Sequence, residues 1–314
     1  MENLQSALRG KCSAQTPISD MIIDNIQDEL KDLSASSLIS RSWLPRSRAH
    51  KLRSIVISTK DRYTAFEEII SASPVICHYV RDVTIDGDSC AVGPFGLLLR
   101  ILLQLRRVES LTLRNCKRDQ LLVDCRSDAS PYFPEIENFC VVGPSEVWSF
   151  TGYDDRSIRR LLLACPKLHV VRLFDIGFRH EALSLGRAEP LPCVEIDTLT
   201  LSSSIDGPSC PSWLARPPFR LRVRKLNLSW FSMNKNSSES SIAVRDLLRG
   251  AGRQLKSLTL SYRESSPLHI APRDHLDLSQ ISQLQSLKLV IGWYNVDSSH
   301  HCVDSSLPLS GHSL

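Results

Sequence analysis

A six-residue pattern of hydrophobic positions (apolar, x, x, apolar, x, apolar) recurs nine times along the chain. In the third copy the apolar residues are Val108, Leu111 and Leu113, and polar residues such as Thr112 lie between them. The nine copies begin at Leu52, Val80, Val108, Ile136, Leu168, Ile196, Val223, Leu255 and Leu284. Successive copies start 28, 28, 28, 32, 28, 27, 32 and 29 residues apart. Self-similarity at so narrow a period indicates a repeat protein.

Each copy of the pattern predicts a β-strand. Residues two apart along a strand point to the same side, so Leu111 and Leu113 share one face while Thr112 points to the other. The segments between copies predict helices over residues 63–79 (ending near Pro74), 95–107, 156–165 and 243–255. Turns are expected instead over the Pro- and Ser-rich residues 120–134 and 203–220, and residues 234–241 predict an exposed insertion loop.

A unit of one strand and one helix cannot bury its own apolar face. Stacking such units in parallel buries the face and produces a solenoid, in which the strands form one curved parallel sheet and the helices lie on its outer side. The alternative is a Rossmann-like α/β domain with the same alternation of strands and helices. The constant period and the absence of a G-x-G-x-x-G fingerprint favour the solenoid.

This predicted arrangement resembles the leucine-rich repeat. That family places Asn or Cys three residues after the last Leu of the pattern, and here only Cys116 occupies that place. The other copies carry Lys60, Asp88, Pro144, Ile176, Ser204, Phe231, Arg263 and Gly292. We therefore expect an α/β fold with a degenerate, leucine-rich-repeat-like solenoid over residues 53–295.

The first fifty residues follow a different pattern. Thr16 can cap a helix that has Pro17 at its first position, where a missing N–H does no harm. The following apolar residues have helical spacing. Asp32 can cap a second helix that ends at Trp43, and Pro45 can open a third that reaches Leu52. Three short helices are thus predicted over residues 16–52, between an N-terminal tail (1–15) and the repeats.

The second predicted helix carries a phrase of the form L-x-x-x-S-L-V-x-[RK]-x-W, made by Leu33, Ser37, Leu38, Ile39, Arg41 and Trp43. With the Pro17-Ile18 start before it, this region resembles an F-box, in a form common among fungal F-box proteins. The resemblance implies docking onto a Skp-family subunit of a cullin–RING ubiquitin ligase, with the attached repeats capturing a protein substrate. By analogy with the motif, the adaptor-facing residues are Pro17, Ile18, Ile22, Leu33 and Leu38. The alternative for each is a place in the core of the module itself.

The strand face turned away from the helices is the candidate recognition surface. It is rich in small polar residues, and its basic residues favour an acidic partner. The residues expected to bind the substrate are Arg114, Arg172, Phe174, Lys225 and Lys288. Phe174 is the candidate anchor, since aromatic residues often carry binding energy. A plain solvated sheet face is the alternative.

Composition narrows the class of protein. The net charge of +4 over 314 residues, with 6% aromatic residues, does not indicate nucleic-acid binding. No apolar run is long enough to span a membrane, and the first residues lack a secretory pattern. The ten cysteines form no C-x-x-C pair, so we expect mostly buried, reduced thiols and a cytoplasmic or nuclear protein. A basic run from Arg41 to Arg53 is interpreted as a solvated helix face, or alternatively as a nuclear-import or phosphate-binding patch.

Motifs of catalysis are missing from the sequence. There is no G-x-S-x-G, H-E-x-x-H or G-x-x-x-x-G-K-[ST], so neither an enzyme nor a cofactor or metal site is expected. Residues 296–314 continue no repeat and are expected to form a tail. Two alternatives to a ligase adaptor stay open: a stand-alone repeat scaffold for protein binding, and an α/β hydrolase or transferase whose site the motifs do not identify.

Overall fold

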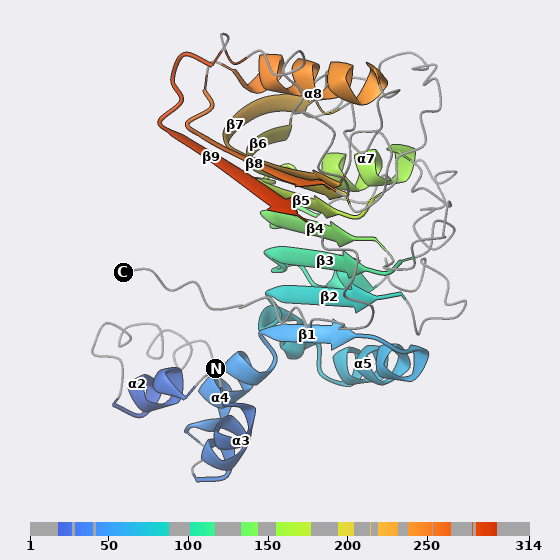
Figure 1. Ribbon diagram of the computed structural model, residues 1–314. Helices are drawn as coiled ribbons and strands as arrows, with labels where there is room; N and C mark the ends of the chain where they lie inside the picture. The colour runs from blue at the N-terminus through green and yellow to red at the C-terminus, as the bar shows by residue number, and fades with distance from the viewer. Residues whose placement is uncertain are drawn as a thin grey trace, which may run out of the picture.

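The fold is mixed α/β, built around nine parallel strands in one open sheet (Figure 1). The computed structural model describes residues 18–26, 29–39, 42–87, 101–116, 133–143, 155–176, 194–203, 214, 219–231, 238–252, 254–264, 278 and 281–293. The strands follow one another in sequence order across the sheet. They are β1 (Ser54–Ile57), β2 (Asp82–Asp86), β3 (Ser110–Arg114), β4 (Asn138–Val142), β5 (Val170–Phe174), β6 (Val194–Ser203), β7 (Phe219–Phe231), β8 (Ser257–Glu264) and β9 (Ser286–Trp293).

The predicted parallel sheet is confirmed, and its register follows the hydrophobic pattern. Val83 of β2 pairs with Leu111 of β3, and Leu111 pairs with Phe139 of β4. The same alignment of the second and third apolar positions continues from β1 to β9. Each repeat therefore contributes its apolar pair to two continuous apolar rows that run across the whole sheet.

The residue before a strand links neighbouring repeats through its carbonyl oxygen. The oxygen of Arg53 accepts hydrogen bonds from the N–H groups of Arg81 (2.8 Å) and Asp82 (2.9 Å). Arg81, Glu109, Glu137, His169 and Lys256 accept in the same way from the repeat that follows each of them. Because two adjacent N–H groups converge on one oxygen, the chain bends as it enters each strand. That bend lets the first apolar residue of the pattern point into the core as well.

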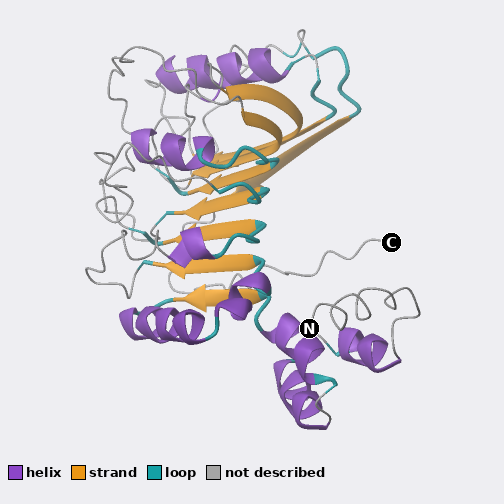
Figure 2. Ribbon diagram, turned by 180° about the vertical axis from the view of Figure 1, so that it is seen from behind, coloured by secondary structure: helices purple, strands orange, loops and turns teal. Residues whose placement is uncertain are grey.

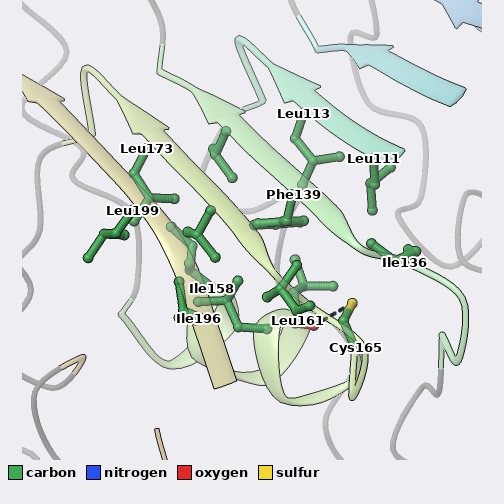
Figure 3. Close-up of a cluster of buried hydrophobic side chains, with 14 of the residues drawn as sticks. Leu111, Leu113, Ile136, Phe139, Ile158, Leu161, Cys165, Leu173, Ile196 and Leu199 are labelled. Carbon is green, nitrogen blue, oxygen red and sulfur yellow. Dashed lines mark hydrogen bonds between the residues drawn. The ribbon is translucent and has the colours of Figure 1, made fainter. Parts of the chain in front are cut away.

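The core lies between the sheet and the helices. In β3, Leu111 and Leu113 are buried, Ser110 and Thr112 are half-buried, and Arg114 is exposed. Figure 3 shows Ile158 and Leu161 of α7 (Asp155–Leu163) beside strand residues such as Ile196, and all three are buried. Every strand from β1 to β8 contributes to this one cluster. Burial of a shared apolar face between repeats is what stabilises a solenoid-like stack.

Helices in the segments between strands lie beside the sheet (Figure 2). Those described are α5 (Lys60–Ala72), α7, α8 (Ser238–Ala251) and the 3-10 helix η1 (Pro74–His78), together with helical residues 101–104. Thr59 caps α5, because its hydroxyl accepts the Arg62 N–H at 3.2 Å. The helix predicted over residues 63–79 is therefore two elements, divided at Ser73 before Pro74.

Two predicted loops need correction. Ser238–Ser241, in the predicted insertion loop 234–241, form the first turn of α8, where a serine start and an early Glu239 suit a helix N-terminus. Phe219 and Arg220, at the end of the predicted turn region 203–220, already belong to β7. Most of the predicted turn segments, and the tails 1–15 and 296–314, lie outside the described residues.

The turns after β2 to β5 alternate between glycine and a left-handed residue. Asn115 (φ 50°) and Asp175 (φ 53°) have positive φ, and Gly87 and Gly143 occupy the same place in the preceding repeat. A Cβ on Gly87 would lie 2.6 Å from the Asn115 carbonyl oxygen, and a Cβ on Gly143 would lie closer still to that of Asp175. Each left-handed residue thus requires a glycine in the neighbouring turn.

The position that holds Asn or Cys in regular leucine-rich repeats is filled in different ways. The Cys116 side chain is buried and its thiol donates to the Arg114 carbonyl oxygen at 3.3 Å. Ile176, at the corresponding place after β5, is also buried, but its side chain has no hydrogen-bond donor. Lys60 instead begins α5. The turns are therefore held by apolar packing and backbone hydrogen bonds as much as by a side-chain donor.

Candidate functional site

The N-terminal module consists of three helices in the region where three are predicted, but the second begins before Asp32, its predicted cap, and ends before Trp43. They are α2 (Ile18–Asn25), α3 (Leu30–Ile39) and α4 (Leu44–Lys51). Ile23 and Leu33 are buried in the module. Between α3 and α4, the Ser36 hydroxyl donates to the Leu33 carbonyl (2.9 Å) and lies 3.0 Å from the Ser47 hydroxyl. Since the Ser36 proton is already used, Ser47 donates that second bond.

One carboxylate fixes α2 to α4. The Nε and Nη2 atoms of Arg46 each donate to an oxygen of Asp24 at 2.7 Å, and the Nε2 atom of His50 lies 2.7 Å from Asp24 Oδ1. The hydrogen bond from Arg46 is the main reason that the pKa of Asp24 falls to about 2, with His50 adding to the effect. Two members of the basic run from Arg41 to Arg53 therefore have Asp24 as a structural partner. The helical spacing of α2 gave no sign of this pairing.

Four large apolar side chains are exposed on the module, among charged and polar residues. Leu38 is 86% exposed and Ile39 67% exposed on α3, and Met21 and Ile22 are exposed on α2. Of the predicted adaptor-facing residues, Ile22 and Leu38 are thus on the surface. Leu33 is fully buried and belongs to the core of the module, because it lies on the side of α3 that also carries Ser36. Ile18 begins α2 but its side chain is outside the described part of the chain, as is all of Pro17.

The second surface is the sheet face that the described helices do not cover, called here the uncovered face. It carries all five predicted substrate-binding residues: Arg114 on β3, Arg172 and Phe174 on β5, Lys225 on β7 and Lys288 on β9. The four cations are exposed and Phe174 is half-buried. Most of their neighbours on this face are Ser, Thr and Asn.

The register brings part of this set together. Arg114 pairs with Val142 of β4, and Val142 pairs with Phe174 of β5, so Val142 and Phe174 form an apolar spot beside Arg114. Arg172 is two residues before Phe174 on the same strand and pairs with Cys140. Lys225 and Lys288 lie two and four strands further along the sheet.

Ion pairing separates the uncovered face from the edge where the strands begin. At that edge six basic side chains have carboxylate partners: Arg53–Asp82 (3.8 Å), Arg81–Glu109 (3.0 Å), Lys167–Glu135 (2.8 Å), His169–Asp197 (3.5 Å), Arg222–Glu195 (3.1 Å) and Arg224–Asp197 (4.0 Å). None of the four cations of the uncovered face pairs with a carboxylate of the described residues. The acidic residues described on this face, Asp82 and Asp86, lie together on β2.

The described cysteines are free and are buried or half-buried. Burial raises the pKa of the Cys140 thiol, although the Arg172 and Arg114 guanidinium groups act in the opposite direction. Burial raises the pKa of Cys165 to about 12, and its thiol donates to the Leu161 carbonyl at 3.2 Å (Figure 3). Both thiols are therefore protonated at neutral pH, a state that is a poor nucleophile.

Within the described residues, no three His, Cys, Asp or Glu side chains come together in a way that could hold a metal ion. None of the described helices combines the length and the apolar character that a membrane span requires. Comparison with known proteins finds no matching family model and no significant match among curated proteins or solved structures.

Proposed function

We propose that this chain is the substrate-recognition adaptor of an SCF-type cullin–RING ubiquitin ligase, acting in the cytoplasm or nucleus. The N-terminal module docks a Skp-family adaptor in the manner of an F-box, and the uncovered face of the repeats binds a protein substrate. The observation that carries the proposal is the exposure of large apolar side chains on the module, with Leu38 of the F-box-like phrase 86% exposed.

The exposed apolar residues favour a protein partner. Fully burying one such side chain is worth about 1.5–3 kcal/mol. Met21, Ile22, Leu38 and Ile39 together could therefore contribute several kcal/mol to docking. A module of three helices with 8, 10 and 8 residues has little core of its own, so contacts with a partner would also stabilise it.

The connection between module and repeats suits an adaptor, which must hold its substrate at a defined place relative to its ligase. Helix α4 ends at Lys51 and β1 begins at Ser54. In the two residues between them, the N–H of Leu52 donates to Arg48 (2.9 Å) and that of Arg53 donates to His50 (3.2 Å). So short a linker, hydrogen-bonded to the helix, restricts movement of the repeats relative to the docked module.

In this proposal the chain contributes binding and its ligase partners supply the chemistry of ubiquitin transfer. The uncovered face offers cations, hydroxyls, amides and a half-buried aromatic ring, all of which are groups that bind peptides. Its one cysteine among the described strands, Cys140, is kept protonated by burial. A general base or nucleophile on this chain is not needed.

Co-purification with a Skp-family adaptor tests the proposal. The full chain is co-expressed with the adaptor, as wild type, as Leu38→Asp and as Leu103→Asp. Leu103 is an exposed leucine of the repeats, so its variant makes the same chemical change away from the module. We expect wild type and Leu103→Asp to retain the adaptor and Leu38→Asp to lose it, with unchanged circular dichroism. If wild type fails to bind, or both variants bind equally, the chain is not this kind of adaptor and a stand-alone binding scaffold takes precedence.

A further inference from the structure

Three cations of the uncovered face lie on a straight diagonal across the sheet. Arg114 is in register with Phe174, which is two residues beyond Arg172 on β5. Arg172 is in register with Asn227, which is two residues beyond Lys225 on β7. Each step thus moves two strands along the sheet and two residues back. Arg114, Arg172 and Lys225 are called the basic diagonal below.

The spacing along the basic diagonal follows from sheet geometry. Two strands span about 9.6 Å and two residues about 6.6 Å, so successive Cα atoms are about 12 Å apart. An extended chain covers that distance in about three to four residues, since each residue rises about 3.3 Å. A bound segment with acidic residues at positions i, i+3 or i+4, and i+7 therefore places one carboxylate near each cation.

The cations of the basic diagonal form no ion pair with the described carboxylates, although Asp86 of β2 is in register beside Arg114. No carboxylate of the described residues pairs with Arg114, Arg172 or Lys225, whereas five Lys or Arg residues and His169 at the strand-entry edge do have such partners. Among the described side chains of the uncovered face the acidic residues are Asp82 and Asp86 of β2, and Asp82 already has Arg53 beside it. The carboxylates of the described strands β3 to β7 are Glu195 and Asp197 of β6, and both lie at the strand-entry edge beside basic side chains. A partner that crosses the uncovered face from β3 to β7 therefore meets mainly positive charge.

An apolar spot accompanies the start of the diagonal. Val142 pairs with Arg114 on one side and with Phe174 on the other, and all three belong to one row of the uncovered face. An apolar side chain between the first two acidic residues of the bound segment would pack on Val142 and Phe174. That contact would fix the register of the segment, because beyond Phe174 the row continues through small polar residues, Ser202 on β6 and Ser229 on β7.

The geometry points to an extended acidic protein segment as the substrate of the uncovered face, with Asp or Glu every three to four residues and an apolar residue after the first of them. This inference rests on the proposed function, because it names what the recognition face binds. Single cations about 12 Å apart suit single carboxylates better than a phosphate group, which is commonly bound by clustered Arg side chains.

Selection from a random 16-residue peptide display library on the full chain tests this inference. One bait is wild type, and a second carries Arg114→Glu, Arg172→Glu and Lys225→Glu. A third carries Lys60→Glu, Arg106→Glu and Arg245→Glu, which makes the same change in charge at exposed positions away from the diagonal. Circular dichroism melts establish that all three baits are folded.

We expect wild type and the third bait to enrich peptides with Asp or Glu three to four residues apart. Binding of a selected peptide, followed by fluorescence anisotropy, should weaken at least about tenfold on the diagonal variant and fall with added salt. Enriched peptides without this acidic spacing, or equal binding to wild type and the diagonal variant, would overturn the inference. So would tighter binding of a phosphoserine peptide with no other acidic residue, or of a single-stranded oligonucleotide.

The same baits distinguish failure of this inference from failure of the proposed function. The diagonal variant should still co-purify with the Skp-family adaptor, since its changes lie on β3 to β7. Adaptor binding without acidic peptides would overturn only the inference. Acidic peptides without adaptor binding would overturn only the ligase role.

Discussion

Truncation of Leu113 tests the packing of the repeats directly, because the chain contains a matched control. Leu113 on β3 is 1% exposed, and Leu289 occupies the same place of the pattern on β9 but is 62% exposed. The two residues belong to the same row of the sheet. Leu113→Ala and Leu289→Ala thus remove identical atoms from a buried and an exposed end of one row.

The expected losses differ by burial. Removing the buried leucine atoms and leaving a cavity between β2, β4 and the helices should lower the free energy of unfolding by about 3 kcal/mol, within the usual range of about 2–5. For Leu289, about a third of the side chain is covered, so the transfer term is about 1 kcal/mol or less and no closed cavity forms. The two variants should therefore differ by about 2 kcal/mol.

Urea unfolding followed by far-UV circular dichroism measures this difference. Because stacked repeats can unfold in part, hydrogen exchange of the β2–β4 amides should accompany it, and Leu113→Ala should accelerate exchange there first. Equal losses in the two variants, or a larger loss for Leu289→Ala, would refute the assignment of Leu113 to a closed core and of Leu289 to an open end.

Two further predictions concern local contacts. Because the pKa of Asp24 is lowered to about 2, its interaction with Arg46 and His50 stabilises the module above about pH 4. This stabilisation, about 1 kcal/mol for a partly exposed pair, is lost as the pH falls toward 2. Asp24→Asn should remove that part of the pH dependence of urea unfolding. An unchanged pH dependence would show that the interactions of Asp24 add no stability. Gly143→Ala should lower the unfolding free energy by about 2–3 kcal/mol, because its Cβ meets the Asp175 carbonyl, whereas Gly250→Ala on the exposed surface of α8 should be neutral or slightly stabilising. Equal thermal unfolding midpoints for the two glycine variants would contradict the close approach.

The sheet was predictable because two periods coincide in the sequence. Alternation within the pattern assigns Leu111 and Leu113 to one face, and the spacing near 28 residues aligns them with the apolar residues of the next repeat. Between β6 and β7 the alignment is less simple, whereas the two 32-residue spacings leave it regular. Ile196 pairs with Leu221 but Thr198 pairs with Lys225. Between these two pairs the chain advances four positions along β7 but only two along β6. A bulge of this kind depends on local turn geometry, which has no periodic signature in the sequence.

The candidate sites were predictable in part for the same reason. Residues on the uncovered face follow from strand alternation, so all five predicted members lie on it. The surface of the N-terminal module depended instead on which sides of three short helices meet, and helical spacing did not distinguish Leu33 from Leu38. The pairing of Asp24 with Arg46, which are 22 residues apart, is equally invisible to periodicity.

The alternation of Gly87, Asn115, Gly143 and Asp175 has a consequence for how such a chain can lengthen or shorten. The unit whose turns fit each other is a pair of successive repeats, about 56 residues long. The turn after the first strand of the pair holds a glycine, and the turn after the second holds a residue of positive φ. Deletion of residues 88–143 would remove one such pair and bring Gly87 next to Asp175, so that a glycine still faces the left-handed residue. Deletion of residues 116–143 alone would instead place the Cβ of Asn115 against the Asp175 carbonyl oxygen. We therefore expect this stretch to tolerate the duplication or loss of repeats in pairs, but not of single repeats.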